Sequence, residues 1–302
     1  MDDFRSGFVS VIGRPNVGKS TLINTLLRQK IAVVSPRPQT TRRTQLGILT
    51  IEGAQIVFVD TPGLHAPRHK LGEALNLAAE ETLEGVDEIL WIVDASDEPK
   101  DEDRQIASLL MRLKHPPTFI LGLNKIDRIS EEVLAKRRAA FTELLPSAQA
   151  ILSFSATRGD GCTELLTALS AHLPVRPPDY PEEQVTDLRE RDLVADLIRE
   201  AALIYLRDEV PHSLAVRVDE FTERGQAGAY IAATVFVERD SQKGIVIGQD
   251  ARMLKKIGSA ARREIEVMSG RKIFLQLRVK VLKEWRNDET ALKRLGYIIR
   301  RK

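Results

Sequence analysis

Short apolar runs, separated by polar stretches, occupy the first 173 residues of the chain. Runs of this length bounded by Gly, Pro, Asp or Asn predict buried strands; they cover residues 8–12, 46–51, 55–59, 119–123 and 150–154. Strands that alternate with helical segments predict a doubly wound, mostly parallel α/β sheet. The second and third runs are joined by only three residues, too few for a crossover, so we expect one antiparallel strand.

The pattern changes after residue 173. Four prolines lie between residues 174 and 181, and such a segment favours an extended, semi-rigid spacer. Beyond it, the apolar spacing predicts an α+β order of elements: a helix over 188–208, strands over 213–221 and 229–238, a helix over 259–268 and a strand over 273–282. We therefore predict a domain over 1–173, a linker over 174–187 and a second domain with a C-terminal tail over 188–302.

The loop after the first strand has the spacing of a phosphate-binding loop. It reads Gly-Arg-Pro-Asn-Val-Gly-Lys-Ser between a predicted strand and a helix expected over 17–27. Backbone N–H groups of such a loop surround a phosphate, the lysine adds charge at the β- and γ-phosphates, and the serine hydroxyl reaches Mg²⁺. The alternative is a chance glycine-rich turn. The residues expected to bind the nucleotide here are Gly13, Arg14, Pro15, Asn16, Val17, Gly18, Lys19, Ser20 and Thr21.

A second polar segment, Asp60-Thr61-Pro62-Gly63, ends the strand predicted over 55–59. A carboxylate at a strand end holds Mg²⁺ through water, and a glycine N–H there contacts a γ-phosphate. We therefore expect these four residues at the nucleotide, with Asp60 at the metal.

Two further strand ends predict which base is bound. Asn124-Lys125-Ile126-Asp127 follows one strand and Ser155-Ala156-Thr157 follows the next. The Asp127 carboxylate can accept two hydrogen bonds from the N1–H and N2–H₂ edge of guanine, and adenine offers no such pair. Asn124 is expected to brace the loop, the Lys125 stem to cover one face of the base, and an N–H of residues 155–157 to bond guanine O6.

These four motifs together resemble the GTPase superfamily over about residues 5–173. The phosphate-binding loop, residues 35–42 (Ser-Pro-Arg-Pro-Gln-Thr-Thr-Arg) and residues 60–64 (Asp-Thr-Pro-Gly-Leu) are most similar to the TrmE-Era-EngA-like family of bacterial GTPases. The resemblance implies that Thr41 joins Ser20 and Asp60 around Mg²⁺ only when a γ-phosphate is present. The loop near residues 35–43 would then be a nucleotide-dependent switch; a polar surface loop with no such role is the alternative.

The resemblance also predicts how hydrolysis proceeds. Leu64 stands where Ras-like GTPases carry the glutamine that orients the attacking water, and leucine has no donor or acceptor, so slow intrinsic hydrolysis is expected. Asn16 corresponds to an asparagine that helps related GTPases bind K⁺, which gives a hypothesis of potassium stimulation. Lys19, Thr41 and Asn16 are the expected catalytic residues. We expect His65, Arg37, Arg42 and Arg43 to be solvated, or the arginines to face RNA.

The second half resembles a KH domain of the bacterial (type II) topology over about residues 188–282. Gly248-Gln249-Asp250-Ala251 takes the place of the Gly-x-x-Gly loop that clamps single-stranded RNA, with alanine for the second glycine. Because alanine suits a helix start, we expect the fold not to suffer. Trp285 is expected to cover the core. The residues expected to bind RNA are Lys243, Ile247, Gly248, Gln249, Ala251, Arg252, Lys255 and Lys256.

Charge separates the two halves. The chain has 45 Lys and Arg against 43 Asp and Glu, but residues 188–302 hold 24 of the basic and 17 of the acidic residues. An excess of basic residues in one half favours a polyanionic partner. The single cysteine, Cys162, excludes an internal disulfide and is expected to pack as a small apolar residue. No signal peptide and no run long enough to span a membrane are recognised, so we expect a cytoplasmic protein.

Taken over nearly the whole chain, the order of motifs resembles Era-type GTPases. The resemblance implies a ribosome-assembly factor that uses GTP, binds 16S ribosomal RNA near its 3′ end and acts on the 30S precursor. It further implies a monomer, with a peripheral association with the inner membrane left open. Two alternatives remain at this point: a signalling switch whose basic half meets anionic lipid or protein, and an RNA-binding scaffold that holds GTP without turnover.

Overall fold

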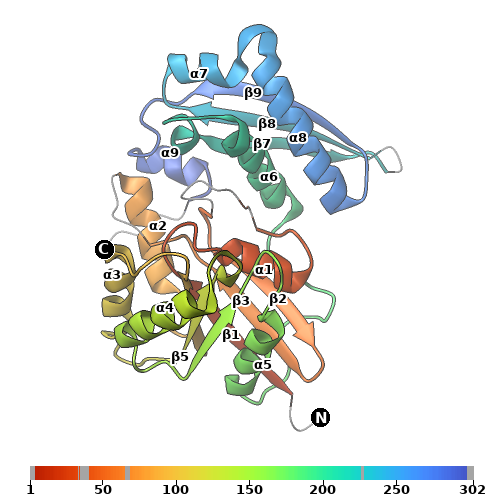
Figure 1. The fold of residues 1–302 in the computed structure, drawn as a ribbon. Helices are drawn as coiled ribbons and strands as arrows, with labels where there is room; N and C mark the ends of the chain where they lie inside the picture. Colours follow the sequence, from red (N-terminus) through yellow and green to blue (C-terminus); the bar gives the residue numbers. More distant parts are fainter. Residues whose placement is uncertain (1–3, 33, 35–40, 65–68, 226–227, 298–302) are drawn as a thin grey trace. The chain divides into compact units, whose positions relative to one another are not determined.

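The structure is a computed structural model that describes residues 4–32, 34, 41–64, 69–225 and 228–297. Its contacts divide the chain into two compact units (Figure 1). The first comprises residues 1–32, 41–66 and 75–187, and the second comprises residues 33–40, 67–74 and 188–302. Each unit is described by itself below.

The first unit is built on a six-stranded sheet with the order β2-β3-β1-β4-β5-β6. All neighbouring strands are parallel except β2 and β3, which pair antiparallel as predicted. The strands are β1 (Arg5–Ile12), β2 (Gln45–Ile51), β3 (Ala54–Asp60), β4 (Glu88–Asp94), β5 (Thr118–Asn124) and β6 (Ala150–Phe154).

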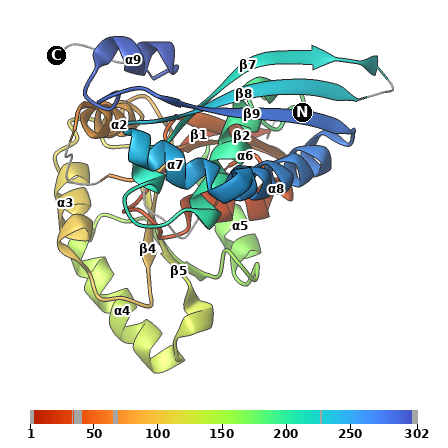
Figure 2. The ribbon, with the colours of Figure 1, turned by 90° about the horizontal axis from the view of Figure 1, so that it is seen from above.

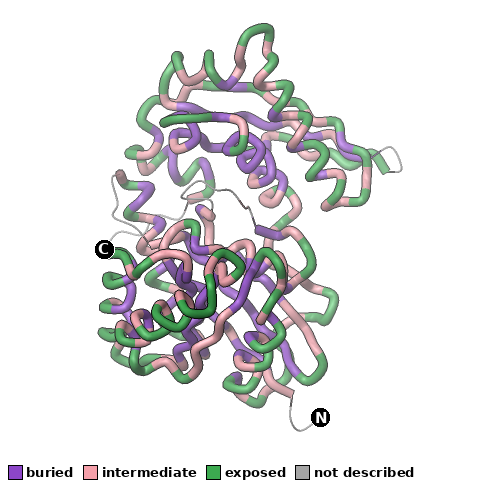
Figure 3. Tube along the Cα trace, in the orientation of Figure 1, coloured by how far each residue is buried: buried purple, intermediate pink, exposed green. Residues whose placement is uncertain are grey.

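Helices cover both faces of this sheet. One face packs against α1 (Lys19–Leu27) and α5 (Cys162–His172), and the other against α3 (Asp101–Leu110) and α4 (Glu131–Leu144). Helix α2 (Lys70–Glu81) precedes β4. The strands are the most deeply buried part (purple in Figure 3) because both faces are covered. Cys162 is buried at the start of α5, which confirms the prediction for its packing.

The proline-rich segment is not a free spacer. Its residues group with the first unit and hydrogen-bond along the sheet. Ile48 N–H donates to Val185 O at 2.9 Å, Leu46 N–H donates to Asp187 Oδ1 at 2.9 Å, and the Gln55 side chain bonds to the backbone of Asp179 and Tyr180. Prolines prevent a regular ladder here, but they leave carbonyl groups free to accept hydrogen bonds from β2.

The second unit has the order helix–strand–strand–helix–helix–strand, which is the type II KH topology expected from the resemblance. Its sheet runs β7-β8-β9, with β7 and β8 antiparallel and β8 and β9 parallel. Helices α6, α7 and α8 share one core with one face of that sheet (Figure 2). The elements are α6 (Glu190–Tyr205), β7 (Ala215–Glu223), β8 (Ala229–Val237), α7 (Asp240–Ile247), α8 (Arg252–Ser269) and β9 (Ile273–Val281).

One helix boundary was predicted wrongly. Helix α8 begins at Arg252 rather than at residue 259, because the glycine at 258 lies within the helix and does not end it. The C-terminal segment contains a short helix, α9 (Glu289–Arg294), capped by the Asp288 carboxylate. Trp285 is fully buried and donates its Nε1–H to Ser213 O at 2.8 Å, which confirms that it covers the core. Within the described chain, no helix combines the length and the apolar character needed to cross a bilayer.

Candidate functional site

The phosphate-binding loop joins β1 to α1, as predicted. Gly18 has φ +106°, and a Cβ built on it would lie 2.2 Å from Asn124 Nδ2, so only glycine fits here. Gly63 approaches the same loop from the end of β3, where a Cβ would lie 3.0 Å from the Pro15 nitrogen. Glycine at these two positions therefore lets the backbone of the loop and of the β3 end pack closely, as a phosphate-binding loop requires.

Lys19 lies buried at the base of this loop. Its Nζ donates to Gly13 O at 2.9 Å and to Arg14 O at 3.1 Å, which holds the ammonium group beneath the loop. Burial lowers the pKa of Lys19 to about 8, although the nearby Asp60 carboxylate opposes this shift. The side chain is thus already positioned to bind an anion. A bound anion would stabilise the charged ammonium group, which has lost its hydration through burial.

The three residues predicted to hold Mg²⁺ lie within hydrogen-bonding distance of one another. Ser20 Oγ and Thr41 Oγ1 are 2.9 Å apart, and they donate to Asp60 Oδ2 at 3.1 and 3.2 Å. The other carboxylate oxygen, Asp60 Oδ1, is buried with no hydrogen-bond partner among the described residues. Burial raises the pKa of Asp60, against the opposing charge of Lys19. Two hydroxyl groups and a carboxylate with one oxygen left without a hydrogen bond among the described residues provide the oxygen ligands that Mg²⁺ prefers.

Asn124 ties three segments of the site together. Its Nδ2 donates to Val17 O at 2.7 Å, and its Oδ1 accepts from Ala156 N at 2.9 Å and from Lys125 N at 2.7 Å. The side chain is 2% exposed. One amide therefore fixes the phosphate-binding loop against both predicted base-binding segments, which is the bracing that the sequence predicts.

Asp127 lies at the rim of the site on a short 3₁₀ turn and is exposed. Ser155 Oγ donates to Asp127 Oδ1 at 2.6 Å, which orients the carboxylate and joins the two predicted base-binding segments. Lys125 Nζ forms an ion pair with Asp94 at the end of β4. The Ala156 N–H already donates to Asn124, so a base carbonyl that binds it would share this donor.

Several contacts that support the site are visible only in the structure, whether or not the residues that make them belong to a motif. Gln45 Nε2 donates to Asp60 Oδ2 at 3.2 Å, and Thr61 Oγ1 donates to Val11 O at 2.8 Å. Arg14 is held away from the loop by Asp97 at 2.9 Å and Asp103 at 3.1 Å. The acidic partners come from the loop after β4 and from α3, so only the fold brings them to the site.

The predicted switch lies largely outside the described residues. This applies to residues 33 and 35–40, including Arg37, and to His65, whereas Thr41 is described. Arg42 is only 5% exposed, so the expectation that it is solvated is wrong. Leu64 packs against the hydrophobic core cluster that includes β4 and β5. Its apolar side chain therefore contributes to packing and cannot orient a water molecule.

The predicted RNA-binding loop of the second unit joins α7 to α8. Asp250 and Ala251 both adopt left-handed backbone, with φ +50° and +60°. The expectation that alanine costs the fold nothing here is therefore wrong, because a Cβ in this region is unfavourable by about 1–2 kcal/mol. Asp250 points into solvent and pairs loosely with Arg252 at 3.7 Å.

The other residues predicted to bind RNA lie around this loop. Arg252, Lys255, Lys256 and Gln249 are exposed, whereas Lys243, Ile247, Gly248 and Ala251 are half-buried. Lys256 Nζ lies 4.5 Å from the centre of the Tyr205 ring. The predicted residues are thus together at one end of α8, but not all of them are equally free to contact a ligand.

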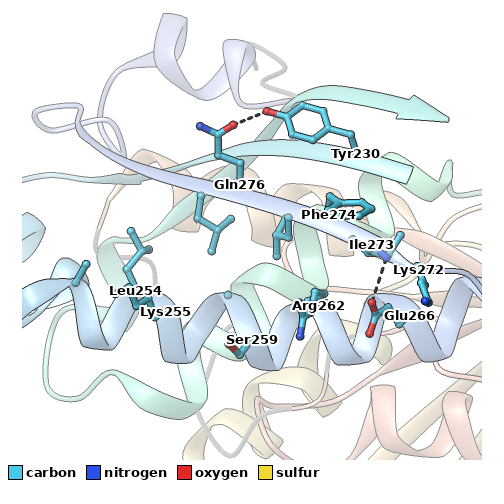
Figure 4. Close-up of a pocket in the computed structure, with 14 residues that line it drawn as sticks. Tyr230, Leu254, Lys255, Ser259, Arg262, Glu266, Lys272, Ile273, Phe274 and Gln276 are labelled. Carbon is cyan, nitrogen blue, oxygen red and sulfur yellow. Dashed lines mark hydrogen bonds between the residues drawn. The ribbon is translucent and has the colours of Figure 1, made fainter. Parts of the chain in front are cut away.

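A groove of about 610 Å³ runs between α8 and β9 (Figure 4). The Ala251 loop lies at one end and Lys272 at the other, with Lys255 and Arg262 on the helix side. Lys272, Ile273 and Phe274 line the strand side but were not predicted as binding residues. Apolar strand residues beside cations on a helix suit a single strand whose bases meet the sheet and whose phosphates meet the helix.

Comparison with known families and proteins agrees with this architecture. Residues 8–125 match the family described as 50S ribosome-binding GTPase, and residues 209–286 match the KH domain family. The chain is 46% identical to GTPase Era of Ruminiclostridium cellulolyticum, over 97% of this chain and 98% of that protein. It is 43% identical to GTPase Era of Heliobacterium modesticaldum, over 98% of each.

Two solved structures share the whole fold at 35% identity and a TM-score of 0.93, each covering 98% of this chain and 100% of the other. One is Era in complex with MgGDPNP and nucleotides 1506–1542 of 16S ribosomal RNA, and the other is a variant of Aquifex aeolicus Era bound to GDP and AlF4⁻. Given the identities and coverage, the chain belongs to the Era family of GTPases, with a P-loop GTPase domain followed by a C-terminal KH domain.

Proposed function

We propose that this protein binds GTP with Mg²⁺ at the β1–α1 loop and hydrolyses it to GDP and phosphate. The cluster of Ser20, Thr41 and Asp60, with its unpartnered carboxylate oxygen, is the observation that carries the metal assignment. Ser20, Thr41 and Asp60 would hold Mg²⁺ beside the phosphates, where its positive charge would offset the negative charge of the transferring group. The relative solved with MgGDPNP supports the same pairing of metal and guanine nucleotide.

The protein's own groups then position the γ-phosphate for attack by water. The Lys19 ammonium donates to the Gly13 carbonyl beneath the loop, and Gly63 closely approaches the same loop at Pro15. We expect the backbone N–H groups of the non-proline loop residues and of Gly63 to bind the phosphate oxygens. Such fixed donors stabilise the charge of the transferring group without reorganisation. Because Leu64 cannot orient water, we expect the intrinsic rate to be low, with the Thr41 segment ordered only around a triphosphate. We keep the hypothesis that Asn16 helps a K⁺ ion to stimulate the reaction.

Guanine selectivity tests the assignment of the base-binding residues. An Asp127→Asn side chain keeps one acceptor for N1–H and offers an N–H donor where guanine also has a donor. It should therefore weaken GTP binding by roughly 100-fold and strengthen XTP binding, because xanthine carries a carbonyl at that position. Calorimetry with GTP, XTP and ATP measures this. Binding of ATP by the unmodified protein as tightly as GTP would contradict the proposal.

We further propose that the α8–β9 groove of the KH domain binds single-stranded 16S ribosomal RNA near its 3′ end. The groove's cations, its edge strand β9 and the Gly248 loop support this, as does the related Era complex with nucleotides 1506–1542. Gel shifts with that RNA segment and with a shuffled control test it. Equal affinity for both RNAs would remove the proposed specificity.

The cellular role follows from these two activities. We propose that the protein acts on the 30S precursor as a monomer in the cytoplasm, and that GTP state sets how it holds the RNA. Liposome flotation beside an RNA gel shift separates this role from the alternative of a switch at anionic lipid, and it also tests peripheral membrane association. Flotation with vesicles in the absence of RNA binding would favour the alternative.

A further inference from the structure

The RNA groove does not end at the edge of the KH sheet. Its lining includes Ile273 and Leu275, which face the helices, and also Tyr230, Phe274 and Gln276, which lie on the opposite face. Figure 4 shows Tyr230 and Gln276 beyond β9, on the side away from α8. Because β9 is an edge strand, a ligand in the groove can pass over it and continue onto the outer face.

The outer face carries an arginine and two aromatic rings at this point. Tyr230 and Phe274 are neighbours in the β8–β9 register. The Arg224 guanidinium lies 5.1 Å from the centre of the Tyr230 ring and 5.9 Å from that of Phe274. Tyr230 Oη donates to Gln276 Oε1, which fixes its ring, and Phe274 is 55% exposed. We call Arg224, Tyr230 and Phe274 the outer-face triad.

We propose that the outer-face triad is a stacking site for an unpaired base of the RNA strand that occupies the groove. This inference rests on the proposed RNA-binding function and extends its footprint. A planar guanidinium and exposed rings accept any base through its π-face, and each stacked base contributes strongly to single-strand binding. Helices α6, α7 and α8 pack on the other face of the sheet, and of the two rings Phe274 is exposed and Tyr230 is partly exposed.

The charges around the triad match a nucleic acid strand. Lys272 and Arg262 flank the path at the end of the groove, and both are exposed. Arg278 and Lys280 continue along the outer face of β9. Arg278 is partly neutralised, because it forms an ion pair with Asp219 at 2.9 Å. A strand that leaves the groove near Lys272 would therefore meet cations on both sides of the aromatic rings, which favours RNA over an apolar partner.

A nested series of RNAs tests the extension. Single-stranded fragments of the 1506–1542 segment that just fill the groove, about four nucleotides, are compared with fragments extended by about three nucleotides at either end. For the unmodified protein we expect extension at one end to raise affinity about tenfold by fluorescence anisotropy. Arg224→Gln, whose side chain lies outside the groove lining, should bind the short fragment normally and lose part of this gain. Phe274→Ala should lose the gain itself, measured as the ratio of long-fragment to short-fragment affinity in the same variant.

Val267→Ala is the matched control, since Val267 is an exposed apolar residue of the same domain outside the groove lining. It should keep the full gain. A 2-aminopurine placed in the extension should change its emission on binding the unmodified protein but not Phe274→Ala. If Phe274→Ala and Arg224→Gln both keep the whole gain in affinity on extension of the RNA, the triad does not contact the extension and the inference is overturned. If short RNAs fail to bind the unmodified protein, the groove proposal itself fails.

Discussion

In the nucleotide-binding unit, Lys19, Asp60 and Asn124 are buried and hydrogen-bonded within the site, whereas the cations around the KH groove are mostly exposed. Asp60 and Asn124 are 0% and 2% exposed, while Arg252, Lys255 and Lys256 face solvent. Interactions in a dry, preorganised site are strong and interdependent, and those at an exposed surface are weak and nearly additive. The same kind of substitution should therefore have very different effects in the two units.

Glu88 gives the largest expected effect of a buried polar group in the nucleotide-binding unit. It lies outside the nucleotide site, so its effect is on stability alone. It begins β4, is fully buried, and neither carboxylate oxygen has a hydrogen-bond partner among the described residues. Burial, helped by the charge of Asp87, raises the pKa of Glu88 to about 8 from 4.5. The folded state therefore holds a proton that the unfolded state releases, and stability falls as pH rises from the unfolded towards the folded pKa.

We expect the unmodified protein to lose on the order of 4 kcal/mol of stability from this group between pH 5 and pH 9. Glu88→Gln should remove that part of the loss, because an amide does not titrate there. Urea denaturation at both pH values measures the difference, with the exposed Glu132→Gln as control. An identical pH dependence in Glu88→Gln and the unmodified protein would show that Glu88 is ionised in the folded state.

Lys19 has the next largest expected effect. Lys19→Gln removes a buried charge at the β- and γ-phosphates, so we expect single-turnover hydrolysis to fall by about 100- to 1,000-fold. Lys136→Gln, which changes an exposed lysine of α4 that pairs with Glu132, should leave the rate unchanged. A loss of less than about threefold in Lys19→Gln would place the lysine outside the transition-state contacts.

Ala251 brings the comparison to the second unit. Ala251→Gly relieves left-handed backbone and should stabilise the KH domain by about 1 kcal/mol. Ala260→Gly, in the interior of helix α8 that follows Ala251, should instead destabilise the KH domain by about 1 kcal/mol. Trp285 fluorescence in a Trp91→Phe background follows this domain in urea, because each unit contains one of the two tryptophans. If Ala251→Gly and Ala260→Gly lower the free energy of unfolding by the same amount, residue 251 does not have left-handed backbone in solution.

The sequence was sufficient to predict features fixed by local chemistry. Glycine spacing located the phosphate-binding loop, and apolar periodicity placed most strands within two residues of their observed ends. The three-residue connection before β3 predicted the antiparallel pair. Local chemistry singled out Ser20 and Asp60 and the resemblance to GTPases added Thr41, and the structure brings these three side chains within hydrogen-bonding distance.

Features that depend on tertiary contacts were missed. The sequence does not show that residues 174–187 hydrogen-bond to the strands, with Val185 and Asp187 bonded to β2, since prolines predict only that a helix is absent. Gln45 and Asp94 carry no motif, and their roles arise from strand register. The outer-face triad combines residues from the end of β7, from β8 and from β9, so only the paired sheet brings them together.

Lys255 and Lys256 provide the smallest test of the comparison. Both lysines are predicted from the sequence to bind RNA. In the structure, only Lys255 of the two lines the groove, whereas Lys256 Nζ lies over the Tyr205 ring. Each phosphate contact on single-stranded RNA contributes about 0.7 to the slope of log affinity against log salt. Lys255→Gln should therefore lower that slope by about 0.7 and weaken binding severalfold, while Lys256→Gln should change both less. Equal slopes for the two variants would mean that the α8 cations attract RNA only through their summed field and not through separate phosphate contacts.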